Sequence, residues 1–191
     1  MPIEFLIFLT VFTPALVGGL NLIFNKNPNV RDTVTLLGAL ITFYFSANIF
    51  LGFDGKATQY KLATIMPGID ISFHIEPLGI VFSLLASGLW ILTHIYAIGY
   101  MRGAKEKNHS RFFFFFSVSI ASVMGISFSG NLFTLFLFYE LLTLITFPLV
   151  SHKGSTEALR GARVYLSILL GTSIGLQSVS YTHLTLPTIR S

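Results

Sequence analysis

Two adjoining apolar stretches decide the fold of this chain: residues 112–150 read FFFFFSVSIASVMGISFSGNLFTLFLFYELLTLITFPLV. A helix that crosses a lipid bilayer needs about 20 mostly apolar residues, because the hydrocarbon core is about 30 Å thick. Residues 112–128 and 132–150 are each long enough, and Ser129-Gly130-Asn131 forms a tight break between them. The segment therefore predicts two membrane-spanning helices joined by a short turn.

Further apolar stretches of the same kind lie on both sides of this pair. Residues 3–24, 33–52 and 78–100 predict three more spans, and residues 164–177 begin a sixth that is cut short. The first stretch has no basic leader and no Ala-x-Ala site, so we interpret it as a retained helix rather than a signal peptide. We expect an all-α membrane protein: a helical bundle with five complete spans and a truncated sixth.

The composition agrees with lipid as the main solvent. The chain has 191 residues, of which 53% are hydrophobic and 10% charged, whereas soluble domains carry about 25% charged residues. Cysteine is absent, which excludes a disulfide scaffold, an iron–sulfur site and a thiolate zinc site. No phosphate-binding loop, dinucleotide fingerprint or clustered metal-ligand motif occurs in the sequence. We therefore expect no cofactor, no metal and no catalytic residue in the chain alone.

The positions of the basic residues predict the orientation in the membrane. With the N-terminus outside, nine basic residues fall on the inner side: Lys26, Arg31, Arg102, Lys105, Lys107, Arg111, Lys153, Arg160 and Arg163. Two, Lys56 and Lys61, fall in the outer loop. Because inner loops of membrane proteins carry an excess of Lys and Arg, we expect an external N-terminus in the cell inner (plasma) membrane. The net charge of +4 then reflects topology and not a nucleic-acid partner.

The outer loop before the third span has a period of two. Ile69, Ile71, Phe73 and Ile75 alternate with polar residues, a pattern typical of a half-buried strand. Pro67-Gly68 suits a tight turn, and residues 60–65 are candidates for the other arm. We expect a small β-hairpin on the outer surface, with an irregular loop as the alternative.

The chain changes character after Gln177. Residues 178–191, SVSYTHLTLPTIRS, are polar and Thr-rich and resemble translated sequencing-adaptor read-through. The 14 residues before them, 164–177, would make a helix of about 21 Å, too short to span. We expect residues 1–177 to be the N-terminal part of a membrane domain and residues 178–191 to be a non-native tail. A genuine short C-terminus is the competing interpretation.

One acidic residue lies at mid-membrane. Seven of the eight acids fall in loops or at span ends, whereas Glu140 lies near the middle of the fifth span. An ionised carboxylate there costs about 3 kcal/mol or more on insertion scales, so it must face protein or water. Desolvation raises the pKa of a carboxyl group and a nearby cation lowers it, so a carboxyl group subject to both can gain and lose a proton as the cation moves. Glu140 is therefore a candidate proton site, and the alternative is a protonated Glu that ties two helices together.

Four further residues are candidates for a proton pathway. Thr143 and Thr146 lie on the same broad helix face as Glu140 and could bond the carboxylate or a water chain. His94 lies near the inner end of the third span, where it either forms a hydrogen bond between helices or relays protons. His152 follows the fifth span and could lie at the inner mouth of the pathway.

Several stretches resemble the proton-pumping antiporter-like subunits. Residues 73–78 (FHIEPL) resemble the start of the third helix in these subunits, and residues 95–101 (IYAIGYM) resemble the end of that helix. The most specific match is residues 130–142 (GNLFTLFLFYELL). His152-Lys153 and the residues after them continue the resemblance, which covers about residues 1–177. The family includes membrane-arm subunits of respiratory complex I, hydrogenase relatives and the D-type subunits of Mrp-type cation/proton antiporters. The Mrp D-type and hydrogenase-type branch is the most similar.

The resemblance implies a function and partners. Glu140 would be the helix-five glutamate of the proton site, which in the family pairs with a Lys on helix seven, beyond the end of this sequence. The family often has Asp where Glu76 stands, which keeps the charge. The implied partners are other membrane subunits of an antiporter or of a respiratory or hydrogenase complex, the lipid bilayer, protons and, as a second candidate, sodium. Any oxidoreductase activity would belong to the assembled complex. The alternative is a structural membrane-arm subunit in which Glu140 only bonds helices.

Overall fold

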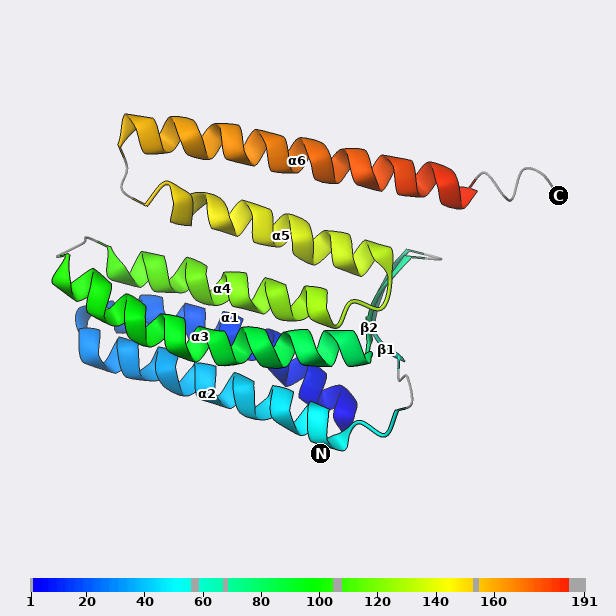
Figure 1. Ribbon diagram of the computed structural model, residues 1–191, viewed down its shortest axis with the longest axis horizontal. Coiled ribbons are helices and arrows are strands. Elements are labelled where there is room, and N and C mark those ends of the chain that lie inside the picture. Colours follow the sequence, from blue (N-terminus) through cyan, green and yellow to red (C-terminus); the bar gives the residue numbers. More distant parts are fainter. Residues whose placement is uncertain (1, 56–58, 67–68, 105–107, 153–154, 186–191) are drawn as a thin grey trace.

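Six α-helices and a two-stranded hairpin make up the described part of the chain (Figure 1). The computed structural model describes residues 2–55, 59–66, 69–104, 108–152 and 155–185. The elements in chain order are α1 (Ile3–Ile23), the 3-10 helix η1 (Phe24–Lys26), α2 (Pro28–Gly52), β1 (Gln59–Met66), β2 (Ile69–His74), α3 (Pro77–Gly103), α4 (His109–Ser127), α5 (Leu132–Val150) and α6 (Thr156–Thr185).

Five of these helices are long and apolar enough to cross a membrane. They are α1 continued by η1, α2, α3, α4 and α5, which confirms the five predicted spans. The largest shift in a boundary is at α2, which begins at Pro28 and not near Thr33. Proline favours the first turn of a helix, because its fixed φ is already helical and its missing N–H would have had no partner there.

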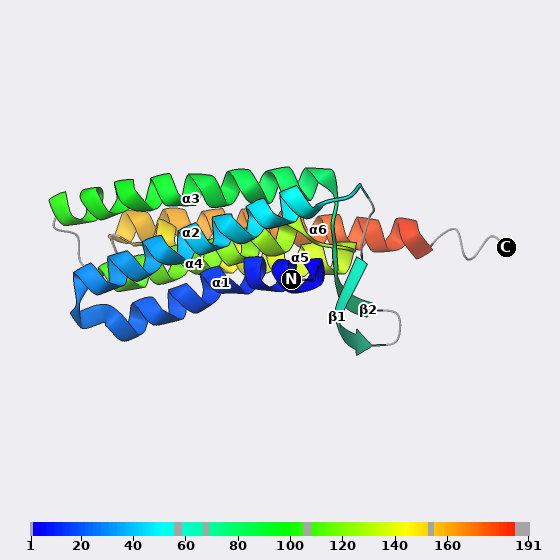
Figure 2. The same ribbon diagram turned by 90° about the horizontal axis from the view of Figure 1, so that it is seen from below.

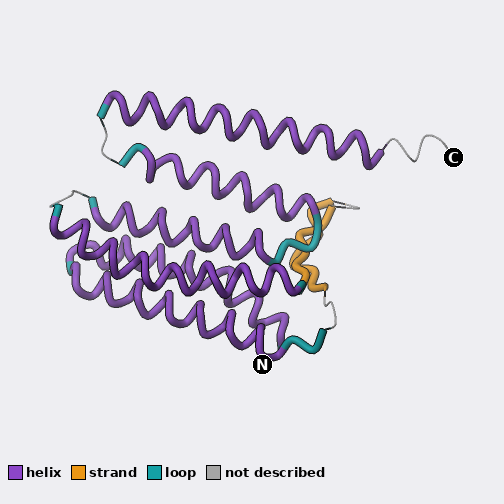
Figure 3. Tube along the Cα trace, viewed as in Figure 1, coloured by secondary structure: helices purple, strands orange, loops and turns teal. Residues whose placement is uncertain are grey.

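The first four helices form a compact bundle, to which the last two are added one after the other. Within the bundle α1 packs against α2 and α4, and α3 packs against α2 and α4; α5 then packs on α4 and α6 on α5 (Figures 1 and 2). One end of the bundle carries the hairpin (Figure 3), and we call it the hairpin end. The opposite end, the basic end, carries most of the described basic residues: Lys26, Arg31, Arg102, Arg111, Arg160 and Arg163.

The predicted hairpin is confirmed. Strands β1 and β2 pair antiparallel, with Gln59 opposite His74 and Tyr60 opposite Phe73. Two register shifts interrupt β1, between Lys61 and Ala63 and between Thr64 and Met66, and such bulges twist and bend a strand. The predicted turn at Pro67-Gly68 lies outside the described residues.

A buried apolar core lies toward the hairpin end and joins the hairpin to the bundle. Its members come from five helices and β2: Leu6, Ile7, Val11, Ile49, Phe73, Ile75, Ile80, Met124, Phe128 and Phe138. Gly125 allows a close approach in this core, because a Cβ added there would lie 2.3 Å from the Phe138 ring. The ring of Phe138 on α5 therefore packs directly against the backbone of α4.

The last helix is longer than the apolar stretch that predicted it. The apolar stretch predicts a helix over residues 164–177, but α6 is one continuous helix of 30 residues. The Ser155 hydroxyl accepts a hydrogen bond from the Ala158 N–H at 3.1 Å and caps its start. Once a helix is nucleated, each added residue gains a backbone hydrogen bond at little cost, so polar residues at both ends continue the helix.

Candidate functional site

Asn131 fixes the start of α5, the helix that carries Glu140. Its Oδ1 accepts the Thr134 N–H at 2.7 Å, the usual bond of an N-capping residue. Its Nδ2 donates to the Asp70 carbonyl at 2.7 Å and to Ser72 Oγ at 2.9 Å. One side chain thus caps α5 and ties it to β2.

Backbone hydrogen bonds strengthen this junction between β2 and the α4–α5 turn. The His74 N–H donates to the Phe128 carbonyl and the Gly130 N–H donates to the Ser72 carbonyl, both at 2.8 Å. The Ser72 N–H donates to Thr134 Oγ1 at 3.0 Å. The hairpin therefore holds the turn from both sides and sets the direction in which α5 enters the bundle.

Glu140 lies half-buried on α5 and faces α6. Its carboxylate Oε1 accepts a hydrogen bond from Ser173 Oγ of α6, and Ser173 itself is buried. None of the ion pairs found among the described residues involves Glu140. The carboxyl group therefore has a hydroxyl partner at mid-helix, which can donate to the ionised form and accept from the protonated form.

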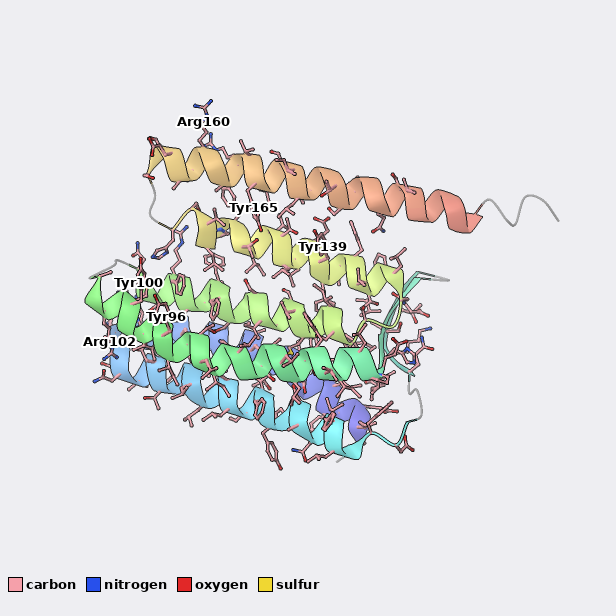
Figure 4. The ribbon with its side chains drawn as sticks, in the orientation of Figure 1. Tyr96, Tyr100, Arg102, Tyr139, Arg160 and Tyr165 are labelled. Atoms are coloured by element: carbon pink, nitrogen blue, oxygen red, sulfur yellow. The ribbon has the colours of Figure 1, made fainter. Side chains whose placement is uncertain are left out.

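A groove between α5 and α6 reaches the Ser173–Glu140 pair from the hairpin end. It has a volume of about 370 Å³ and is lined by Leu132, Leu135, Phe136, Tyr139, Thr172, Ser173 and Gln177. Figure 4 labels Tyr139 on α5. Three hydroxyl groups and one amide among these side chains offer hydrogen bonds to water. The lining is mainly apolar, and these side chains supply its few polar groups beside the Ser173–Glu140 pair.

The two threonines predicted to assist Glu140 bond their own helix. Thr143 Oγ1 donates to the Tyr139 carbonyl and Thr146 Oγ1 donates to the Thr143 carbonyl, both at 3.0 Å. Their hydroxyl protons are thus used within α5, and no hydrogen bond between either threonine and Glu140 is found in the described residues. The structure brings Glu140 together with Ser173 instead, which sequence reasoning missed. The available signal was a hydroxyl residue inside the apolar stretch 164–177.

The two histidines of the predicted pathway lie toward the basic end. His94 is fully buried; its Nε2 lies 3.1 Å from the Asp32 carbonyl of α2, and its ring meets Phe113 of α4 edge-on at 4.9 Å. His152 packs edge-on against Phe112 at 5.5 Å. It also lines a groove of about 410 Å³ that includes Tyr96 and Tyr100, both labelled in Figure 4. Neither histidine has a contact with Glu140 among those found.

An ionic cluster of Arg31, Asp32 and Arg102 closes the bundle at the basic end. Arg31 donates to Asp32 Oδ1 at 2.7 and 2.9 Å, and Arg102 donates to Asp32 Oδ2 at 2.6 and 3.2 Å. Arg31 and Asp32 are buried. Sequence analysis placed all three in inner loops and missed their pairing. The signal for it was an acid directly beside a base at the start of an apolar span.

Polar side chains extend this ionic cluster to the neighbouring elements. Arg31 Nη1 donates to Ser110 Oγ of α4 at 3.2 Å, and Ser110 Oγ donates to Asn25 Oδ1 of η1 at 2.7 Å. Arg102, labelled in Figure 4, also donates to Asn29 Oδ1 at 2.9 Å. The cluster thus joins the basic ends of α1 to α4.

On the hairpin, Asp70 is the acid with an altered proton affinity. Lys61 Nζ lies 2.6 Å from Asp70 Oδ2 across the two strands. The hydrogen bond from the Lys61 ammonium holds the pKa of Asp70 below its ordinary value. This pair stabilises the exposed face of the hairpin while Asp70 is ionised.

Comparisons with known proteins point to one class of membrane subunit. Residues 66–113 match the family described as NADH-ubiquinone oxidoreductase (complex I), chain 5 N-terminus. A Staphylococcus haemolyticus (strain JCSC1435) protein named as antiporter subunit mnhA2 is 31% identical over 126 residues, which are 64% of this chain and 16% of that protein. The A1 subunit of a Na(+)/H(+) antiporter of Staphylococcus aureus (strain JH9) is 31% identical over 103 residues, 53% of this chain and 13% of that protein.

A solved structure shows the same fold. The structure of the membrane-bound sulfane sulfur reductase, an archaeal respiratory membrane complex, contains a chain that matches with a TM-score of 0.78 at 14% identity. The match covers 94% of this chain and 28% of that one. The chain is therefore a multi-pass membrane protein similar to antiporter-like subunits, and it spans less than a fifth of the length of these curated relatives.

Proposed function

We propose that residues 1–177 are the N-terminal part of an antiporter-like subunit that translocates protons, or exchanges a monovalent cation for protons, with Glu140 as its intramembrane proton site. The observation that carries the proposal is the contact of Glu140, at the middle of α5, with Ser173 of α6 beside a mainly apolar groove that Tyr139 and Thr172 also line. The similarity to antiporter and complex I subunits supports the same class of function.

The arrangement suits a carboxyl group that changes its protonation state. The Ser173 hydroxyl can turn its proton toward the ionised carboxylate or accept the proton of the neutral acid, so both states keep a hydrogen bond. Water in the groove would supply and remove the proton on the hairpin side. Thr143, Thr146, His94 and His152 remain predictions for the rest of the pathway.

The proposed setting is the plasma membrane, with the hairpin end and the N-terminus outside. The gathering of basic residues at the opposite end supports this orientation, because basic residues favour the inner side. We propose other membrane subunits, lipid, protons and, as a second candidate, sodium as partners. The Mrp D-type branch favoured by residues 138–142 and 152–154 stays a prediction, whereas the names of the curated relatives favour an A-type antiporter subunit.

The Ser173–Glu140 hydrogen bond also favours a second candidate, a structural membrane subunit. In that case the bond only holds α6 against α5, and no proton moves through Glu140. The two candidates differ in what they predict for a side chain that keeps the hydrogen bond and cannot ionise. Glutamine is such a side chain.

The test is proton transport by the full-length subunit in its complex, with Glu140→Gln and Glu140→Asp. We expect Glu140→Gln to abolish transport in membrane vesicles while the subunit still co-purifies with its partners, and Glu140→Asp to retain part of it. Glu157→Gln, a change of an exposed acid at the start of α6, is the matched control. Transport by Glu140→Gln at the rate of the control would favour the structural candidate.

A further inference from the structure

Polar atoms without partners are buried inside the bundle of α1 to α4. They are Asn21 Nδ2 of α1, Ser46 Oγ of α2, Trp90 Nε1 and His94 Nδ1 of α3, and Ser117 Oγ of α4, and no hydrogen bond is found for any of them within the described residues. Ser46 lies toward the hairpin end of α2 and apart from the other four. Each of these side chains is at most 1% exposed. Buried polar atoms in native proteins nearly always have a protein or water partner. The four atoms on α1, α3 and α4 therefore call for a ligand.

The atoms on α3 and α4 lie at two neighbouring levels of the bundle, one helical turn apart. His94 meets Phe113 edge-on at 4.9 Å. Trp90 precedes His94 by one helical turn, and Ser117 follows Phe113 by one turn on the antiparallel α4. Residues four apart share a helix face, so Trp90 and Ser117 lie one turn further from the basic end than His94 and Phe113.

Helices α1 and α2 close the same region. A Cβ added at Gly18 of α1 would lie 3.4 Å from Ser117 Cβ, and Asn21 follows Gly18 by less than one turn. Asn21 Oδ1 lies 2.7 Å from Thr35 Oγ1 of α2, whose single hydroxyl proton is shared with the Arg31 carbonyl at 3.0 Å, and Asn21 Nδ2 is the unpaired half of the amide. The four helices thus bring these four unpaired atoms to the basic-end half of the bundle.

The donors and acceptors complement those of water. A backbone carbonyl can only accept, so His94 Nε2, at 3.1 Å from the Asp32 carbonyl, carries the proton and Nδ1 of the neutral ring is an acceptor. Trp90 Nε1 and Asn21 Nδ2 are donors, and the Ser117 hydroxyl can accept. Two donors and two acceptors match a water molecule, which makes about three hydrogen bonds when buried.

The charges around the site disfavour a cation. The titratable groups that border it are Arg31 and Asp32 from α2 and Arg102 from α3, which together carry one net positive charge. From α4 and η1 the cluster receives only the uncharged Ser110 and Asn25. We propose that this half of the bundle holds ordered water bridging Asn21, Trp90, His94 and Ser117. It would be a hydrated site separate from Glu140.

The fluorescence of Trp90 tests the proposal, since it is the single tryptophan of the chain. We expect the purified chain in detergent micelles to emit at longer wavelength than an indole in a dry apolar site, with higher intensity in D₂O than in H₂O. Acrylamide should quench it weakly, because the indole is buried. Short-wavelength emission without a solvent isotope effect would overturn the proposal, because it would show a dry indole. Strong acrylamide quenching would also overturn it, because it would show that Trp90 is exposed to bulk solvent.

Two serines on α4 provide a matched pair of variants. Ser117→Ala removes a proposed water ligand, and we expect the Trp90 emission to shift to shorter wavelength. Ser122→Ala removes a hydroxyl that donates to the Val118 carbonyl of its own helix at 3.1 Å, and we expect no shift. An unchanged emission in Ser117→Ala, or equal shifts in both variants, would contradict the site. The isotope effect on the unmodified chain decides the question even where a variant fails to fold.

Discussion

At the scale of single residues, buried charge takes two forms in this molecule. Glu140 has a hydroxyl partner and no ion pair among the described residues, whereas Asp32 receives four hydrogen bonds from two guanidinium groups. The first arrangement gives the carboxyl group a single neutral partner. The second pairs Asp32 with two cations, one of which, Arg31, is buried.

This contrast predicts the effect of neutralising Asp32. Removing one partner of a buried ion pair costs about 3–5 kcal/mol, because the remaining charge is stranded. We therefore expect Asp32→Asn to lower the free energy of unfolding by about 3 kcal/mol, measured by denaturation in detergent. Glu157→Gln, an exposed acid at the start of α6, is the control, with a change within about 0.5 kcal/mol. Equal stability of the two variants would mean that the cluster does not hold the bundle.

The Lys61–Asp70 pair predicts a pH dependence confined to the hairpin. Because the pKa of Asp70 is lowered in the folded chain, its stabilising contribution is present above the unfolded pKa and is lost as the pH falls through the folded value. A carbon-13 titration of the Asp70 carboxyl should give a midpoint below that of an unperturbed Asp. In Lys61→Met the midpoint should return toward the ordinary value; a midpoint that does not move would show that Lys61 is not the cause.

At the scale of elements, the hairpin and α5 should lose stability together. Asn131→Ala removes the N-cap of α5 and two hydrogen bonds to β2. We expect a loss of about 1–2 kcal/mol, at the upper end of the usual effect of a lost cap, with faster hydrogen exchange in both β2 and α5. Ser155→Ala, which removes the cap of α6, should accelerate exchange in α6 and leave β2 unchanged.

The close packing of α5 on α4 predicts that a Gly-to-Ala substitution has opposite effects on stability at Gly125 and at Gly19. A Cβ at Gly125 would lie 2.3 Å from the Phe138 ring, whereas one at Gly19 would meet nothing within 4 Å. We expect Gly125→Ala to destabilise the fold by about 1–3 kcal/mol, as overpacking does. Gly19→Ala should stabilise it by about 0.5 kcal/mol, because alanine favours the helix. Unfolding of the two variants side by side measures the difference, and a Gly125→Ala variant as stable as Gly19→Ala would contradict the packing.

The elements were predictable from the sequence to the extent that a periodic pattern defines them. The apolar runs predicted five spans and the alternation at Ile69 to Ile75 predicted β2, since both follow from which residues face lipid or core. The extent of α6 did not follow from hydropathy, because helix formation continues through polar residues. The Ser173–Glu140 bond and the ionic cluster were missed, because they join residues that only tertiary packing brings together.

At the scale of the whole molecule, the described chain divides by how its helices are held. The bundle of α1 to α4 is closed by the core at the hairpin end and by the ionic cluster at the basic end. Helix α6 packs mainly on α5, and the Glu140–Ser173 contact lies at this peripheral interface. The proposed proton site is thus attached to a rigid four-helix support and lies where a neighbouring helix or another protein of the complex could reach it.

The most direct measurement of the central claim is the rate of proton uptake by the full-length subunit, reconstituted with its complex in liposomes, before and after Glu140→Gln. The account predicts that the variant assembles and takes up no protons above the background of empty liposomes, while Glu157→Gln keeps the original rate. Proton uptake by assembled Glu140→Gln at the original rate would contradict the assignment of Glu140 as the proton site.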